Sequence, residues 1–196
     1  MRGIILLFCL TCQLCLAGPV TEPKFIGDWS ETTNGLRGRL LFAERTQDKW
    51  DIQNNSRSGI VCLEIENLGD TIYIYYAEVT SPLRCELRDS AGNAIPLGNV
   101  FVSSDWRPTP CWLALPNDST LRFSSTVLGS SPRNSLLISV GEPMIGGAWK
   151  IPLDSTNDYY LSGTFSPTPP ENETRPHVWE GILKLPPVRI SAKSLK

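Results

Sequence analysis

The single histidine of the chain, His177, limits the catalytic chemistry that the sequence could support. Nucleophilic hydrolysis by a serine or a cysteine needs a general base, and in the triad enzymes this base is a histidine. His177 lies between Pro176 and Val178, at the end of a proline-rich segment, where we expect an exposed loop residue rather than a general base. A single histidine also excludes a multi-histidine zinc site within this chain.

Other motifs of catalysis are missing from the sequence. It contains neither the G-x-x-x-x-G-K-S/T phosphate loop nor the G-x-S-x-G nucleophile elbow. Its 20 acidic residues make some neighbouring pair of carboxylates inevitable, so their number does not indicate a glycosidase. A net charge of −2 without a basic block gives no electrostatic reason to bind nucleic acid. We therefore expect a protein that is not an enzyme, uses no cofactor and binds no nucleic acid.

Three of the six cysteines, Cys62, Cys85 and Cys111, lie outside the N-terminal apolar stretch and lack the Cys-x-x-Cys spacing of a structural zinc site. Cys85 and Cys111 each share one face of a strand with two leucines, so both should point inward. Cys62 shares its face with glutamates and should point outward. Cys85 and Cys111 are therefore the better disulfide candidates, and the alternative is that both are buried thiols.

Two loop segments could bind a ligand. Trp106 and Arg107 lie in a predicted loop, where an exposed tryptophan beside an arginine could hold a sugar or anchor a protein partner. The alternative is a tryptophan folded over the end of the domain. The loop Asp154–Asp158 offers oxygen side chains, but too few for calcium, which takes six to eight oxygens. We expect this loop to be a turn, and we predict no metal site.

The N-terminus has the order of a secretory signal. A basic Arg2 is followed by an apolar stretch that reaches Leu16 and by the small residues Ala17 and Gly18. This stretch is shorter than the ~20 residues of a transmembrane helix. We predict a signal peptide over residues 1–17, a secreted or periplasmic location, and no membrane insertion after cleavage.

The rest of the chain shows the pattern of an all-β domain. Short runs rich in β-branched and aromatic residues alternate with turn residues every 8 to 12 positions, and no stretch keeps a helical period. We predict an antiparallel two-sheet sandwich over residues 35–191, preceded by a polar leader at 18–34 and followed by a basic tail at 192–196. The predicted strands are 60–66, 71–76, 83–88, 99–103, 111–115, 120–127, 135–140, 148–151, 159–165, 178–185 and 188–191.

Several segments resemble known families. They are Leu83–Gly92, Leu115–Leu121, Tyr159–Phe165, the proline-rich segment Pro167–Pro176, and Trp179–Val188. Together they resemble a group of uncharacterised secreted bacterial proteins with an immunoglobulin-like sandwich, over about residues 36–190. This resemblance implies a fold and an extracytoplasmic location, and no activity. The turn signals at 63–67, 89–92 and 115–119 are also similar to BsuPI-type proteinase-inhibitor domains.

These observations favour a non-catalytic extracytoplasmic binding or accessory module that presents loops from a rigid sandwich. The favoured partner is another extracytoplasmic protein, and a glycan is the alternative. Two more specific hypotheses are an inhibitor of a secreted or periplasmic protease and a carbohydrate-binding module. The loops expected to carry binding are Ser103–Pro110 and Pro167–Pro176.

Overall fold

Strands dominate the computed structural model, which describes residues 20–47, 49–76, 82–102, 111–124, 133–141 and 145–195. The expected all-β class is confirmed. The helical elements in these ranges are the short α1 (Lys49–Gln53) and the 3-10 turn η2 (Ala192–Leu195). No helix in the same ranges is long and apolar enough to span a membrane.

The largest sheet is built around β3 (Arg57–Asn67). One edge of β3 pairs antiparallel with β2 (Leu36–Arg45) over nearly its full length. The other edge is shared: β8 (Ser119–Ser124) pairs antiparallel with residues 62–67, and β9 (Ser135–Gly141) pairs parallel with residues 57–60. The expectation of a purely antiparallel fold is therefore wrong at this point. A parallel pair needs a long connection, and the chain from β4 to β8 provides it.

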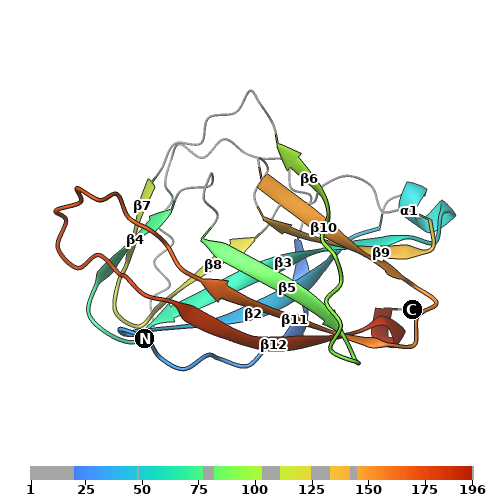
Figure 1. The fold of residues 1–196 in the computed structure, drawn as a ribbon, viewed down its shortest axis with the longest axis horizontal. Coiled ribbons are helices and arrows are strands. Elements are labelled where there is room, and N and C mark those ends of the chain that lie inside the picture. Colours follow the sequence, from blue (N-terminus) through green and yellow to red (C-terminus); the bar gives the residue numbers. More distant parts are fainter. Residues whose placement is uncertain are drawn as a thin grey trace.

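Three further strands extend this sheet, and two smaller sheets accompany it among the described residues (Figure 1). β1 (Val20–Ile26) pairs with β2, while β10 (Ile145–Pro152) and β6 (Gly98–Val102) follow β9. The second sheet has the order β12 (Leu183–Ser191), β11 (Asp158–Phe165), β5 (Leu83–Asp89). The third pairs β4 (Ile72–Tyr76) with β7 (Cys111–Leu115).

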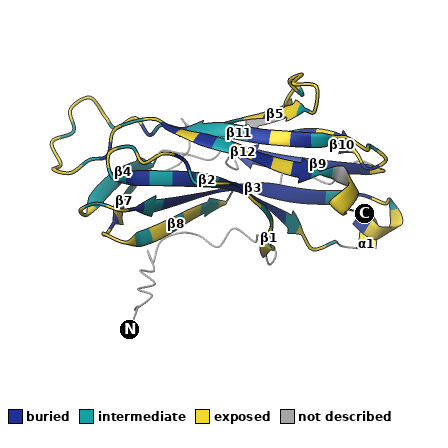
Figure 2. Ribbon diagram, turned by 90° about the horizontal axis from the view of Figure 1, so that it is seen from below, coloured by how far each residue is buried: buried dark blue, intermediate teal, exposed yellow. Residues whose placement is uncertain are grey.

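Side chains from all three sheets meet in one hydrophobic core. Figure 2 shows β5 and β11 as a layer over β2, β3 and β8, with β4 and β7 at one end. On β2, β3, β11 and β12 the residues of the inward face are almost fully buried, in keeping with the period of two. Examples from the three sheets in turn are Phe42, Val61 and Leu63, then Leu161 and Phe165, then Ile74 and Leu115.

The strand boundaries differ from the sequence expectations at both ends of the domain. Residues 20–26, assigned to a polar leader, form β1 and pair with β2. The two predicted strands at 178–185 and 188–191 are one strand, β12, which begins at Leu183 and continues through Pro186 and Pro187. Prolines are tolerated there because β12 lies at the edge of its sheet, where one side of the backbone has no ladder to complete.

Candidate functional site

The outer side of the β4–β7 sheet carries three aromatic rings. Ile74 of β4 points into the core and is fully buried, so Tyr73 and Tyr75 stand on the opposite side. Tyr75 pairs in register with Trp112 of β7, which places their side chains on the same side of the sheet. All three aromatic residues remain half-buried. The alternation of isoleucine and tyrosine in β4 predicts two outward tyrosines from the sequence, but the sequence does not reveal that β7 is the strand that pairs with β4.

A cation completes this group. The guanidinium carbon of Arg175 lies 4.7 Å from the ring centroid of Trp112 and 5.2 Å from that of Tyr73. The rings of Tyr75 and Trp112 are 5.0 Å apart and tilted by 54°. Both distances from the guanidinium lie within the range of a cation–π interaction. We call Tyr73, Tyr75, Trp112 and Arg175 the aromatic face.

The segment that delivers Arg175 is fixed to β4 by its backbone. The amide of Tyr73 donates to the carbonyl oxygen of His177 at 2.9 Å, and the amide of Trp179 donates to the carbonyl of Tyr73 at 2.9 Å. Trp179 itself is 2% exposed and stacks on Phe165 at 6.1 Å. The loop between β11 and β12, which leaves the body of the domain beside β4 and β7 (Figure 1), is therefore held at its returning end.

The side chain of Glu173 binds the backbone of this loop. Its Oε1 accepts hydrogen bonds from the backbone amides of Thr174 and Arg175, at 3.0 and 2.7 Å. The carboxylate thus orders the backbone just before Arg175 reaches the rings. The proline-rich segment Pro167–Pro176, expected as a binding loop, supplies Arg175 to the aromatic face.

Arg175 differs from the other arginines that stack on an aromatic ring. Arg37 and Arg39 lie over Trp29 at 4.7 and 4.3 Å, and each also pairs with a glutamate of β3, Glu66 and Glu64 respectively. Arg175 has no ion pair with any residue in the described part of the chain. Its guanidinium lies against the rings and has no acidic partner among the described residues.

His177 is an exposed loop residue, and the loop Asp154–Asp158 leads into β11. His177 is exposed, has a positive φ of 59°, and binds Tyr73 through its carbonyl oxygen. Asp158 pairs with Arg189 at 2.7 Å, and this hydrogen bond holds the pKa of the Asp158 carboxyl below its ordinary value. In the described ranges, no group of three or more metal-ligating side chains could hold a metal ion.

The two predicted ligand-binding residues, Trp106 and Arg107, lie outside the described residues, as does all of the loop Ser103–Pro110. The residues of the aromatic face were not singled out as a site from the sequence. Trp112 lies in the predicted strand 111–115 without a predicted binding role, and Arg175 belongs to the proline-rich segment Pro167–Pro176, one of the two loops expected to carry binding. The one signal available was the run of tyrosines in Ile72–Tyr76, which carries outward rings beside an inward isoleucine.

The predicted disulfide is not present: Cys85 and Cys111 are not joined. Cys85 points inward from β5 as expected, and burial raises the pKa of its thiol to about 12. Cys111 is exposed rather than inward, since it lies at the end of β7, where the core no longer covers the sheet. Cys62 faces away from the main core, as expected, but it is only 1% exposed, because it packs with Leu41, Ala43 and Ile60 in a second small cluster on the other face of β2 and β3.

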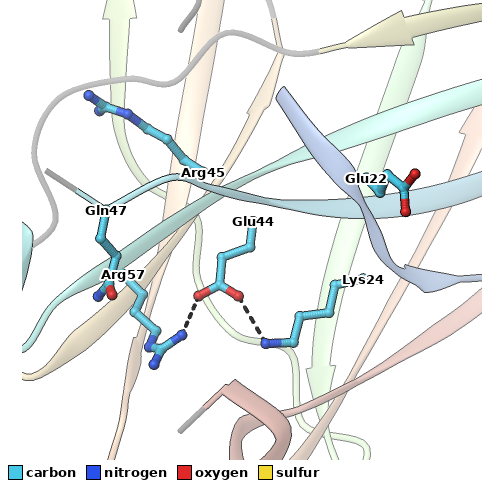
Figure 3. A pocket seen from close by; sticks show the side chains of 6 residues that line it. All are labelled: Glu22, Lys24, Glu44, Arg45, Gln47 and Arg57. Carbon is cyan, nitrogen blue, oxygen red and sulfur yellow. Dashed lines mark hydrogen bonds and ion pairs between the residues drawn. The ribbon is translucent and has the colours of Figure 1, made fainter. Parts of the chain in front are cut away.

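A shallow pocket between β1, β2 and β3 is lined by charged and polar side chains (Figure 3). They are Glu22, Lys24, Glu44, Arg45, Gln47 and Arg57. The carboxylate of Glu44 binds Lys24 at 2.9 Å and Arg57 at 2.6 Å, and Gln47 donates to the carbonyl of Ser56. These contacts link the three strands. The polar groups of the pocket are largely used by one another, so the pocket is a weaker candidate than the aromatic face.

The aromatic face can stack on a flat apolar surface and can donate hydrogen bonds from a fixed guanidinium. Among the described residues, no group of three or more metal-ligating side chains lies beside it. Comparison with known proteins adds no family to this description: no protein-family model, no curated protein and no solved structure matches the chain.

Proposed function

We propose that this protein is a non-catalytic binding module that binds carbohydrate at the aromatic face. The observation that carries the proposal is the placement of Tyr73, Tyr75 and Trp112 on the outer side of one small sheet, with all three rings half-exposed. The apolar C–H side of a sugar ring packs against an aromatic ring, while its hydroxyls bind polar groups at the rim. Rings held by strands lose little conformational freedom on binding.

The surroundings of the aromatic face support a site for an extended ligand. The exposed polar side chains Asn172, Thr174 and His177 border Arg175 along the loop. Short polar side chains of this kind can pair with sugar hydroxyls. We also propose that the sheets form an immunoglobulin-like sandwich that works outside the cytoplasm, as the signal-like order of residues 1–17 suggests. N-terminal sequencing of the exported protein tests the location, with Gly18 as the expected first residue.

Retention on a panel of insoluble and soluble polysaccharides tests the carbohydrate proposal. Wild type should be retained by at least one polysaccharide, and Trp112→Ala should abolish retention because it removes the central ring of the face. Tyr160→Ala is the matched control, since Tyr160 is 37% exposed on β11, away from this face. Equal retention of wild type and Trp112→Ala would place the binding site elsewhere.

A protein partner is the second candidate, because tyrosine, tryptophan and arginine are the residue types that dominate protein-binding hot spots. In that case the protein should capture one dominant partner from the extracytoplasmic fractions of its source, and capture should be lost with Trp112→Ala. The protease-inhibitor form of this hypothesis predicts that the captured partner is a protease and that its activity falls on binding.

A further inference from the structure

We infer that the aromatic face recognises an acidic sugar, a uronic acid within a polysaccharide, with its carboxylate bound by Arg175. This inference rests on the proposed function and adds the chemical class of the ligand. It starts from the unusual state of Arg175, whose guanidinium is fixed between Tyr73 and Trp112 but has no acidic partner among the described residues.

Most of the other described arginines already have a carboxylate partner. Ion pairs occupy Arg37, Arg39, Arg57, Arg88, Arg122 and Arg189. In each of these pairs the guanidinium binds a carboxylate of the same chain. Arg175 has no ion pair among the described residues, and Glu173, two residues before it in the loop, uses its Oε1 to accept hydrogen bonds from two backbone amides. A ligand carboxylate could therefore take the donors of Arg175 without displacing an internal acid.

The position of Arg175 over the rings also bears on where its donors can bind. A guanidinium is planar, and its N–H groups lie in that plane and form a fork that matches the two oxygens of a carboxylate. When the flat side is against aromatic rings, these in-plane donors are at the rim of the stack. Because the rings and the loop backbone already hold Arg175, little side-chain freedom remains to be lost when an anion binds.

The aromatic rings beside Arg175 suit the pyranose ring of the same acidic sugar. Trp112 and Tyr75 form a pair of rings 5.0 Å apart beside Arg175, so a pyranose could lie on a ring while its carboxylate reaches the guanidinium. The charge of the whole chain is −2, so general attraction does not explain the binding of an anion, and selectivity has to come from this local cation. An acidic peptide shares the carboxylate but not the apolar ring face, and we treat it as an outcome of the test.

Affinity electrophoresis and calorimetry of the full chain with polygalacturonate and alginate test the inference. Fully methyl-esterified polygalacturonate is the neutral counterpart with the same rings and linkage, and poly-glutamate is the peptide counterpart. We expect binding to a polyuronate that weakens with added salt, since exposed charges are screened over a Debye length. Arg175→Gln should weaken it by about tenfold or more, the usual effect of losing a charge-assisted hydrogen bond. Arg175→Lys should retain part of the affinity, because the charge remains and the fork is lost.

Arg84→Gln is the matched control, because Arg84 is also exposed and has no ion pair in the described chain, but lies on β5 away from the rings. It should bind like wild type. Circular dichroism and thermal midpoints of each variant exclude misfolding as the cause of lost binding. Equal affinity for the methyl ester, or no effect of Arg175→Gln, would overturn the acidic-sugar inference while the carbohydrate function stands. Binding to poly-glutamate and to no sugar of this set would overturn the acidic-sugar inference in favour of a peptide ligand. Failure to bind any polymer, both here and in the polysaccharide panel, would overturn both the inference and the carbohydrate function.

Discussion

The indole Nε1 of Trp179 donates a hydrogen bond to the carbonyl oxygen of Thr33 at 3.2 Å, although 146 residues separate the two in the sequence. The same indole is 2% exposed and packs on Phe165. This one side chain therefore ties the loop that carries Arg175 to the turn before β2 and to the core. Its removal should weaken both the fold and the aromatic face.

Trp179→Ala should lower the free energy of unfolding by about 3–5 kcal/mol, the usual cost of emptying a buried aromatic site. Trp179→Phe is the matched control, because it keeps a ring beside Phe165 and loses the hydrogen bond to Thr33 and part of the volume. It should cost less, with about 1 kcal/mol from the hydrogen bond itself. Urea unfolding measures both, and equal losses in the two variants would contradict the assigned role of the ring.

A second prediction concerns Glu64, which is 8% exposed and accepts hydrogen bonds from Arg39 and Arg122 at 2.6 and 2.7 Å. Burial raises the pKa of this carboxyl, but the hydrogen bonds and charges of the two arginines outweigh burial and hold it below its ordinary value of 4.5. The stabilisation by the charged carboxylate is thus complete above about pH 4.5. It is lost as the pH falls through the lower pKa of the folded state.

Glu64→Gln should therefore destabilise the protein at neutral pH by about 2 kcal/mol, the scale of charged hydrogen bonds. The difference between the variant and wild type should shrink as the pH is lowered below 4.5, because the wild-type carboxyl becomes neutral too. Glu86→Gln is the control, since Glu86 pairs with Arg88 at 46% exposure and should cost at most ~0.5 kcal/mol. If the difference in stability between Glu64→Gln and wild type did not change with pH, the pKa of Glu64 would not be lowered in the folded state.

The sequence was sufficient to predict much of β3 and β5, because one face of each packs on the core. Val61, Leu63 and Ile65 alternate inward, as does Leu87, and the strands lie where the apolar periodicity places them. The buried state of Cys62 could not be predicted in this way. A period of two tells which residues share a face, but it does not tell whether the second face is also covered.

The candidate site was less predictable than the strands for a topological reason. Tyr75 and Trp112 become neighbours only because β4 pairs with β7, and β5 and β6 lie between these strands in the sequence without joining their sheet. Arg175 arrives from a still more distant loop. Local patterns assign strands and turns, whereas pairings between distant strands depend on the packing of the whole core.

Gly59 gives a third prediction, about packing at the β2–β3 pairing. A Cβ atom added there would lie 2.6 Å from Cε2 of Phe42 and 2.7 Å from the carbonyl oxygen of Ala43. Phe42 is fully buried and cannot swing outward. Gly59→Ala should lower the free energy of unfolding by about 1–3 kcal/mol, the usual cost of overpacking. Gly69→Ala, whose added Cβ would meet nothing closer than 3.6 Å, is the control and should cost far less in the same urea titration.

The three cysteines outside the N-terminal stretch should react with iodoacetamide in a fixed order. Cys111 is exposed and should be alkylated in the native protein. Burial raises the pKa of Cys85 to about 12, and burial also raises the pKa of Cys62, which is 1% exposed. At pH 8 only ~10⁻⁴ of the Cys85 thiol is thiolate, the reactive form, so Cys85 and the buried Cys62 should stay unmodified until the protein is unfolded.

Mass spectrometry of peptides after native and denatured labelling, each with and without reductant, measures this order. All three cysteines should be labelled in denaturant without reductant, because the structure joins none of them to another. Denatured wild type in which Cys85 and Cys111 react only after reduction would show that the two are bonded in the exported protein. That result would require β5 and β7 to approach each other, and it would therefore also change the position assigned to Trp112, the neighbour of Cys111 on β7.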